Sequence, residues 1–205
     1  MSDVSRPATA PGSAAHEGRP VAWVTGASRG LGRAIAVGLA EAGYDVASTA
    51  RTGEALDDVT SSIQALGRET LAVPADVSDP DAVRQAADAV RSRFGRLDAC
   101  VTAAGISPVR TDAVDISDRR WRQILDVNVD GTFWVLREAG RVMKATGNGG
   151  SLVAVSSIHA RVAGPLLAAY SASKGAIEAL VRTLAVDWAP DRIRVNALAP
   201  GYFET

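Results

Sequence analysis

The chain has 205 residues, enough for one large hydrophobic core and too few for two comfortable domains. Apolar residues make up 47% of the sequence and charged residues 22%, a balance typical of a globular protein. The 22 basic and 23 acidic residues nearly cancel, which argues against nucleic acid or a membrane surface as a partner. No run approaches the roughly 20 apolar residues that a membrane-spanning helix needs.

Residues 1–19 are rich in Pro, Ala, Ser and Gly and lack the apolar stretch of a secretory signal, so we expect a disordered tail. We expect residues 20–205 to form a single domain. Cys100 is the single cysteine, which excludes an intrachain disulfide and fits a reducing compartment. We therefore expect a cytoplasmic protein in which Cys100 is a buried, inert thiol.

The segment from Val21 to Gly32 has the order strand, glycine-rich turn, helix. Its glycines, at positions 26, 30 and 32, fit a turn that needs positive φ and a backbone that closely approaches a pyrophosphate. The N-terminus of the following helix offers N–H groups and a positive dipole end to that anion. The segment predicts a dinucleotide-binding loop, with a simple tight turn as the alternative if the rest of the chain gives no supporting context.

Strands and helices alternate along the remaining sequence. Further strands are predicted at 45–50, 70–75, 97–103, 151–156 and 193–198. Further helices are predicted at 54–66, from a cap at Ser78 to about Phe94, at 117–145 and at 169–188. This alternation predicts an α/β fold, a doubly wound parallel sheet of Rossmann type with the order 3-2-1-4-5-6 and helices on both faces. Ligands of such sheets bind at the carboxyl ends of the strands, where the glycine loop lies.

Tyr170 and Lys174 lie four residues apart on one predicted helix, so both project from the same face. A neighbouring cation favours the phenolate and lowers the tyrosine pKa, which proton transfer near neutral pH requires. Ser157, at the end of the fifth strand, is placed to hydrogen-bond the same substrate oxygen. Alone, a Tyr-x-x-x-Lys pair is more often a solvated helix face, and its coupling to the serine and the glycine loop favours catalysis.

These features occur together with several others along the chain. The motifs are Thr25-Gly26-x-x-x-Gly30-x-Gly32, Asp76, Asn128, Ser156-Ser157, Tyr170-x-x-x-Lys174, and Pro200-Gly201 followed by Thr205. Over residues 19–205 the sequence resembles the short-chain dehydrogenase/reductase family, in its short one-domain, 3-oxoacyl-reductase-like branch.

The resemblance implies that Tyr170 is the general acid or base, that Ser157 polarises a carbonyl, and that Lys174 lowers the tyrosine pKa and holds the nicotinamide ribose. Asn128 would hold a water linked to Lys174; the alternative is a polar helix residue facing solvent. No metal site is implied. The residues implied to bind the cofactor are Gly26, Ser28, Arg29, Gly30, Leu31, Gly32, Arg51, Asp76, Val77, Ala104, Gly105, Tyr170, Lys174, Pro200, Gly201 and Thr205. For Asp76, ordinary turn chemistry before a helix is the alternative.

The cofactor is predicted to be NADP(H) in preference to NAD(H). An acid at the end of the second strand binds a ribose 2′-OH, whereas a nearby arginine accommodates a 2′-phosphate. That strand ends at Arg51 without an acid, and Arg29 lies within the glycine loop. The alternative is that either arginine is merely solvated.

Two features depart from the family pattern. The usual Asn-Asn-Ala-Gly is Thr102-Ala-Ala-Gly105 here, and the chain stops at Thr205, before the helical substrate cover and seventh strand of the family. We therefore expect a chain truncated at its C-terminus, or completed by a partner, with an exposed sixth strand.

The leading hypothesis is an NADP(H)-dependent oxidoreductase that interconverts a ketone and a secondary alcohol, with a small-molecule carbonyl or alcohol as substrate. The alternative is a catalytically silent NADP(H)-binding or interaction protein. The resemblance also implies a homodimer or homotetramer. Two further features stay open: His159 either faces substrate or is an ordinary loop histidine, and the basic run of Arg119, Arg120 and Arg122 is expected to be solvated or subunit-facing.

Overall fold

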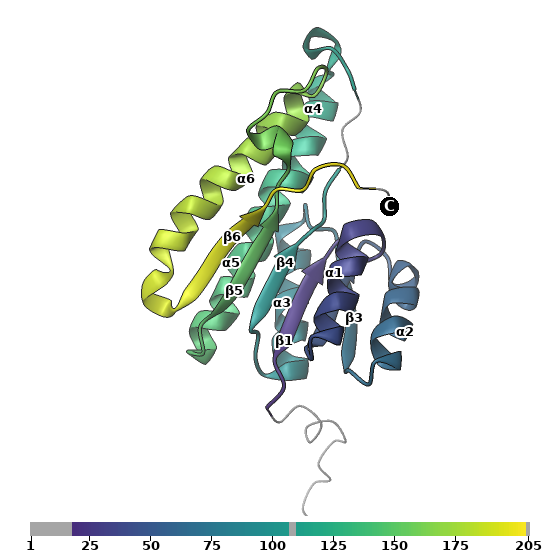
Figure 1. The fold of residues 1–205 in the computed structure, drawn as a ribbon, viewed down its shortest axis with the longest axis vertical. Helices are drawn as coiled ribbons and strands as arrows, with labels where there is room; N and C mark the ends of the chain where they lie inside the picture. Colours follow the sequence, from purple (N-terminus) through teal and green to yellow (C-terminus); the bar gives the residue numbers. More distant parts are fainter. Residues whose placement is uncertain (1–17, 107–109, 204–205) are drawn as a thin grey trace, which may run out of the picture.

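The computed structural model describes residues 18–106 and 110–203, which form a six-stranded sheet with helices packed on its faces (Figure 1). The strands are β1 (Val21–Thr25), β2 (Asp45–Ala50), β3 (Thr70–Pro74), β4 (Ala99–Thr102), β5 (Gly150–Val155) and β6 (Ile193–Leu198). Neighbouring strands are all parallel, in the order β3-β2-β1-β4-β5-β6. The predicted doubly wound α/β fold is confirmed.

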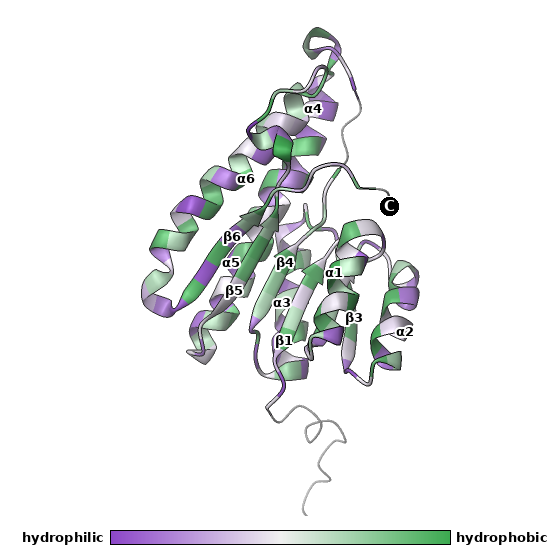
Figure 2. Cartoon of the chain, viewed as in Figure 1, coloured by the Kyte–Doolittle hydropathy of each residue, from purple (hydrophilic) through white to green (hydrophobic). Residues whose placement is uncertain are grey.

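The helices enclose two hydrophobic cores, one on each face of the sheet. They are α1 (Gly30–Glu41), α2 (Asp57–Ala65), α3 (Pro80–Phe94), α4 (Asp118–Leu125), α5 (Gly131–Thr146) and α6 (Ala168–Asp187). α1 and α2 cover the smaller core, around Val46 and Ile63, and α3, α5 and α6 cover the larger one, around Trp23 and Leu136. Figure 2 shows hydrophobic central strands between helices that alternate hydrophobic and hydrophilic residues, as burial of both sheet faces requires. Among the described residues no helix is both long and apolar enough to cross a membrane.

On the side of α1 and α2, the described helices do not cover β6. Ile193 and Val195 of this strand are buried against the larger core, whereas Arg194, Asn196 and Leu198 alternate with them and are exposed. The alternation follows from the two-residue period of a strand with one buried face. The prediction of helices on both faces therefore holds for the centre of the sheet and is wrong for the outer face of β6.

The predicted helix at 117–145 is interrupted. α4 ends at Leu125, a π-helical turn spans Asp126–Asp130, and α5 starts at Gly131. Two contacts account for the wider turn: Asn128 points inward to bond the backbone of Ile106, and Gly131 lies so close to Val77 that a Cβ would stand 2.9 Å from its Cγ2. Such π turns are frequent at functional sites.

The helix α3 is capped by Asp79, and the prediction of a cap at Ser78 is wrong. The Asp79 carboxylate accepts hydrogen bonds from the backbone N–H groups of Asp81 and Ala82, at 2.9 and 3.2 Å. Pro80 occupies the first helical position, where its missing N–H costs nothing. Ser78 instead donates its hydroxyl to Asp76 Oδ1 at 2.7 Å.

The glycine loop between β1 and α1 packs directly against the end of β4. Gly26 has a φ of +70°, and a Cβ there would lie 2.5 Å from the backbone nitrogen of Ala104. The Ala27 N–H donates to Thr49 O, and the Ala103 N–H donates to Thr25 O, each at 3.1 Å. The loop is therefore held against both strands that neighbour β1. Position 26 needs glycine for two reasons: its φ is positive, and Ala104 leaves no room for a Cβ.

Gly26→Ala and Gly67→Ala form a matched pair that separates these reasons. Both glycines have a φ of +70°, but nothing lies within 4 Å of a Cβ at Gly67. We expect Gly67→Ala to lower the free energy of unfolding by about 1 kcal/mol, the cost of a left-handed alanine. Gly26→Ala should cost at least about 2 kcal/mol more because backbone atoms must move. Urea unfolding measures both, and equal losses would contradict the close approach.

Candidate active site

Lys174 and Tyr170 meet at the carboxyl end of β5. The Lys174 side chain, on α6, is 5% exposed, and its Nζ donates a hydrogen bond of 2.8 Å to the carbonyl oxygen of Val155, the last residue of β5. The same Nζ lies 5.7 Å from the centroid of the Tyr170 ring. Lys174 is thus buried against the sheet and Tyr170 is half-buried, so the alternative of a solvated helix face is wrong for Lys174.

Burial lowers the pKa of the Lys174 ammonium from its ordinary value of 10.5 to about 8, because the charged form loses its hydration. Near neutral pH the side chain still carries its charge beside Tyr170. The cation is then in surroundings of low polarity, where its field acts on the phenol more strongly than in water.

Asn128 connects the segment after β4 to α6. Its side chain is fully buried; Oδ1 accepts from Ile106 N at 2.7 Å, and Nδ2 donates to Ser173 Oγ at 3.1 Å. Ser173 in turn donates to the carbonyl oxygen of Tyr170 at 2.7 Å. The solvent-facing alternative for Asn128 is wrong. A Cβ on Gly105 would lie 3.3 Å from Asn128 Oδ1 and 3.8 Å from Lys174 Nζ, so both polar groups border this glycine.

Ser157 directly follows the loop end of β5 and is 6% exposed. It is the N-cap of a 3-10 turn at Ile158–Ala160, and its Oγ accepts a hydrogen bond from His159 N at 3.2 Å. This bond orients the hydroxyl oxygen within the turn that also carries His159. Ser157, from the loop after β5, and Tyr170 and Lys174, from α6, therefore lie at the carboxyl end of the sheet.

Glu178 supports this loop and was not singled out by the sequence analysis. Its buried carboxylate accepts from Arg161 Nε at 2.8 Å, and Ser156 Oγ lies 3.5 Å from its other oxygen. Ser156 Oγ also lies 3.3 Å from the carbonyl oxygen of Lys174. The one available signal was an acidic residue one helical turn after Lys174, on a face that is otherwise buried.

His159 lies between Tyr170 and the C-terminal segment. Its ring centroid is 6.5 Å from that of Tyr170, and its Nε2 is 3.1 Å from the Tyr202 hydroxyl. Pro200 belongs to the same corner, since its carbonyl oxygen accepts from Ile158 N at 3.1 Å. The structure therefore places His159, and the chain leading to Gly201, beside Tyr170. Thr205 lies outside the described residues.

The N-terminus of α1 fits the pyrophosphate of a dinucleotide. Its N-cap, Arg29, makes no side-chain capping bond and the first turn contains no acid, whereas Asp79 caps α3 and Ser117 caps α4. The first N–H groups of α1 therefore receive no side-chain acceptor from the cap residue, as an anion site requires. Gly30 (φ +53°) and the half-buried Ser28 and Leu31 complete the loop.

The remaining predicted cofactor residues lie around this loop. Val77 is buried, Gly32 packs against Gly26, and Ala104 adjoins Gly26 as described above. Asp76 is exposed and accepts both the N–H and the hydroxyl of Ser78, so it makes the turn contacts that were its alternative role. Arg51 is exposed at the end of β2.

The pKa of Lys174 predicts how stability depends on pH. Between pH 8 and 10.5 the unfolded chain binds more protons at this residue than the folded chain, so the free energy of unfolding should rise with pH. Relative to Lys174→Met, the wild type should gain about 1.6 kcal/mol between pH 8 and 9.5, because the slope rises from about 0.7 kcal/mol per pH unit at pH 8 toward about 1.4 kcal/mol per pH unit. Urea unfolding at both pH values tests this, and a constant difference between the two proteins would contradict it.

Comparison with known proteins identifies the chain. The family model for short chain dehydrogenases matches residues 20–205. A 2-dehydro-3-deoxy-D-gluconate 5-dehydrogenase of Pseudoalteromonas atlantica is 39% identical over 189 residues, which cover 90% of this chain and 72% of the relative. Versicolorin reductase 1 of Aspergillus parasiticus is 41% identical over 187 residues, covering 90% of this chain and 70% of its own length.

Solved structures agree with the sequence matches. A 3-ketoacyl-ACP reductase from Sinorhizobium meliloti 1021 is 39% identical, with a TM-score of 0.87, and the match covers 91% of this chain and 73% of that chain. A xylitol dehydrogenase with bound NAD+ is 36% identical, with a TM-score of 0.88, and the match covers 91% and 71% of the two chains. With its fold, its motifs and these matches, the chain belongs to the short-chain dehydrogenase/reductase family and is an oxidoreductase acting on CH–OH groups.

Proposed function

We propose that the chain interconverts a ketone and a secondary alcohol with NADP(H), using Tyr170 as the general acid and base. The observation that carries the proposal is the buried Lys174 ammonium, 5.7 Å from the Tyr170 ring and hydrogen-bonded to the end of β5. A cation in that position favours the phenolate. Residues 20–205 would form one nucleotide-binding domain with the catalytic residues on it, and the substrate would be a small carbonyl or alcohol compound.

In the proposed reaction the bound nicotinamide supplies or accepts the hydride. Tyr170 gives its phenolic proton to the carbonyl oxygen during reduction and removes the hydroxyl proton during oxidation. Ser157 donates a hydrogen bond to the same oxygen and fixes its direction. Lys174 stabilises the phenolate, while Asn128 ties the backbone at Ile106 to Ser173 of α6.

Tyr170→Phe tests the catalytic role. Loss of the hydroxyl removes the proton donor, so we expect turnover to fall by roughly 10²- to 10⁴-fold. NADPH affinity, measured by calorimetry, should change less than about twofold, because the charge of Lys174 stays in place. Tyr44→Phe, a half-buried tyrosine just before β2, is the matched control.

Retained turnover in Tyr170→Phe would remove Tyr170 from its role. A wild-type chain that binds NADPH and turns over no carbonyl compound would favour the second candidate, a silent NADP(H)-binding protein.

The preference for NADP(H) rests on Arg29 and Arg51. Both side chains are exposed: Arg29 lies in the glycine loop, and Arg51 directly follows β2. In the described part of the chain neither forms an ion pair with a carboxylate. They are therefore available to a 2′-phosphate. The similar xylitol dehydrogenase binds NAD+, so similarity to known proteins does not by itself indicate NADP(H). The proposed preference of this chain depends on Arg29 and Arg51.

Calorimetry with NADPH and NADH tests the cofactor preference. Arg51→Gln and Arg29→Gln should each weaken NADPH binding by about 10- to 100-fold, the effect of a charge-assisted hydrogen bond, and leave NADH binding nearly unchanged. Arg84→Gln, on the exposed side of α3 and paired with Asp81, is the matched control. Equal affinities of the wild type for the two cofactors would contradict the preference.

We further propose a homodimer or homotetramer in the cytoplasm. Phe133 and Trp134 on α5 have ring centroids 5.0 Å apart, and Arg137 covers the Trp134 ring at 4.6 Å, which gives α5 an aromatic, partly exposed surface. Aromatic and arginine side chains of this kind are enriched at interfaces, and sedimentation tests the assembly. The single cysteine, Cys100, is buried and free, which agrees with a reducing compartment.

A further inference from the structure

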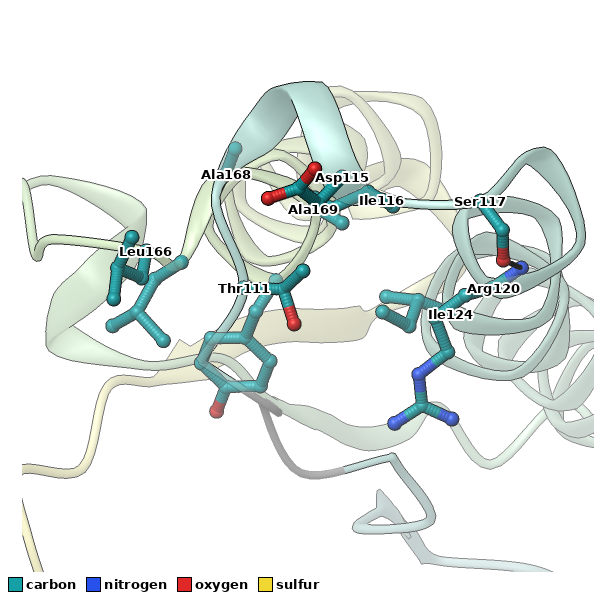
Figure 3. A pocket seen from close by; sticks show the side chains of 11 residues that line it. Thr111, Asp115, Ile116, Ser117, Arg120, Ile124, Leu166, Ala168 and Ala169 are labelled. Atoms are coloured by element: carbon teal, nitrogen blue, oxygen red, sulfur yellow. Dashed lines mark hydrogen bonds between the residues drawn. The ribbon is translucent and has the colours of Figure 1, made fainter.

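A small cavity opens beside Tyr170, between the start of α4 and the start of α6 (Figure 3). Its volume is about 260 Å³, slightly below the usual range for small-molecule pockets of about 300–1,000 Å³. Tyr170 itself forms part of the wall, so a compound in the cavity would lie against the Tyr170 residue. The cavity therefore fits the remainder of a small substrate whose reacting carbon lies at Tyr170.

Arg120 supplies the positive charge of this cavity. Figure 3 shows its guanidinium group projecting from α4 on the side facing Thr111. The half-buried side chain donates one hydrogen bond, of 2.9 Å, from Nη1 to Gln123 Oε1. In the described part of the chain no carboxylate forms an ion pair with it. Most of the guanidinium donors are thus left for a ligand.

The surroundings strengthen this charge. Ile124 and Leu167, which line the same cavity, are 5% and 4% exposed, and Ala169 is 3% exposed. Electrostatic attraction is stronger beside such apolar groups than in water. The planar guanidinium matches a carboxylate, which it binds with two parallel hydrogen bonds. Arg120 is half-buried and lines the cavity, and the expectation that the basic run is solvated or subunit-facing stays a prediction.

Asp115 lies on the other side of the cavity. Figure 3 places its carboxylate away from the Arg120 guanidinium, with Thr111 between them. A second anionic group near Asp115 would be repelled, whereas a hydroxyl group can donate a hydrogen bond to it. The two charges therefore favour a ligand that places a carboxylate near Arg120 and hydroxyl groups near Asp115.

We propose that the substrate is a small hydroxy or keto acid whose carboxylate binds Arg120 while its reacting carbon lies at Tyr170. This inference rests on the proposed function and specifies its substrate class. Arg120 is a specificity-determining residue in this scheme. It takes no part in the transfer of the hydride or the proton, which move between the alcohol carbon and hydroxyl, the nicotinamide and Tyr170.

The test compares two compounds that differ only at the end bound by Arg120. D-gluconate carries a carboxylate where D-glucitol carries a CH2OH group, and the rest of the hydroxylated chain is the same. Binding of each to the full chain with saturating NADP+ is measured by calorimetry, and oxidation is followed through NADPH formation. Arg120→Gln removes the charge, and Arg120→Lys keeps it without the planar pair of donors.

We expect Arg120→Gln to weaken gluconate binding by about 10- to 100-fold and to change glucitol binding less than twofold. The effect on turnover should appear in KM, with kcat nearly unchanged, and Arg120→Lys should recover part of the loss. Arg119→Gln and Arg122→Gln are matched controls, since both arginines are exposed on the same helix and do not line the cavity. Both should behave as wild type.

Three results would overturn the inference: equal loss of both compounds in Arg120→Gln, no loss of gluconate binding, or wild-type binding of glucitol as tight as that of gluconate. Binding without turnover would instead contradict the proposed function and leave the acid site supported. In the described part of the chain the Arg120 side chain forms one hydrogen bond, to the exposed Gln123, so the melting temperature of Arg120→Gln should match that of the wild type if the variant is folded.

Discussion

A buried ammonium group joins the second half of the sheet to α6, and the candidate site depends on it. Lys174 is 5% exposed and, among residues 18–106 and 110–203, forms one hydrogen bond, to Val155 O, which offsets little of the free-energy cost of removing its charge from water. The charge is tolerated because neighbouring bonds hold α6 in place. The same burial that lowers the lysine pKa to about 8 also exposes Tyr170 to the field of a poorly hydrated cation. Burial of Lys174 therefore lowers the stability of the folded chain while it strengthens the effect of the lysine charge on Tyr170.

Two other buried polar side chains keep α6 aligned with the strand ends. Asn128, in the π turn, binds Ile106 after β4 and Ser173 on α6. Glu178, further along α6, accepts from Arg161 in the loop after β5. Each side chain is buried and links α6 to a segment distant in sequence, so losing a partner would leave a buried polar group without its hydrogen bond. The positions of Tyr170 and Ser157 thus follow from contacts made on either side of Lys174.

Features that depend on local sequence could be predicted, and features that depend on tertiary contacts could not. The strands, their order and the shared face of Tyr170 and Lys174 follow from periodicity and from the handedness of crossovers. The π turn at 126–130 could not be predicted, because it results from Ile106 and Val77, which are remote in sequence. The cap at Asp79 was missed because Ser78 is an equally good capping residue and only Pro80 shifts the start. The position of Arg120 at a cavity required the packing of α4 against α6.

The two edges of the described sheet differ from its centre in a way that bears on association between chains. β3 ends at Pro74, which has no N–H to offer to an approaching strand, and β6 carries Arg194 and Asn196 between its buried residues. A one-residue slip of β6 against β5 would bury the guanidinium of Arg194 and expose Ile193, so the alternation that leaves one side bare also fixes the pairing register. The composition of the edge strands therefore favours one pairing and disfavours fibrillar growth, whatever lies against the outer face of β6.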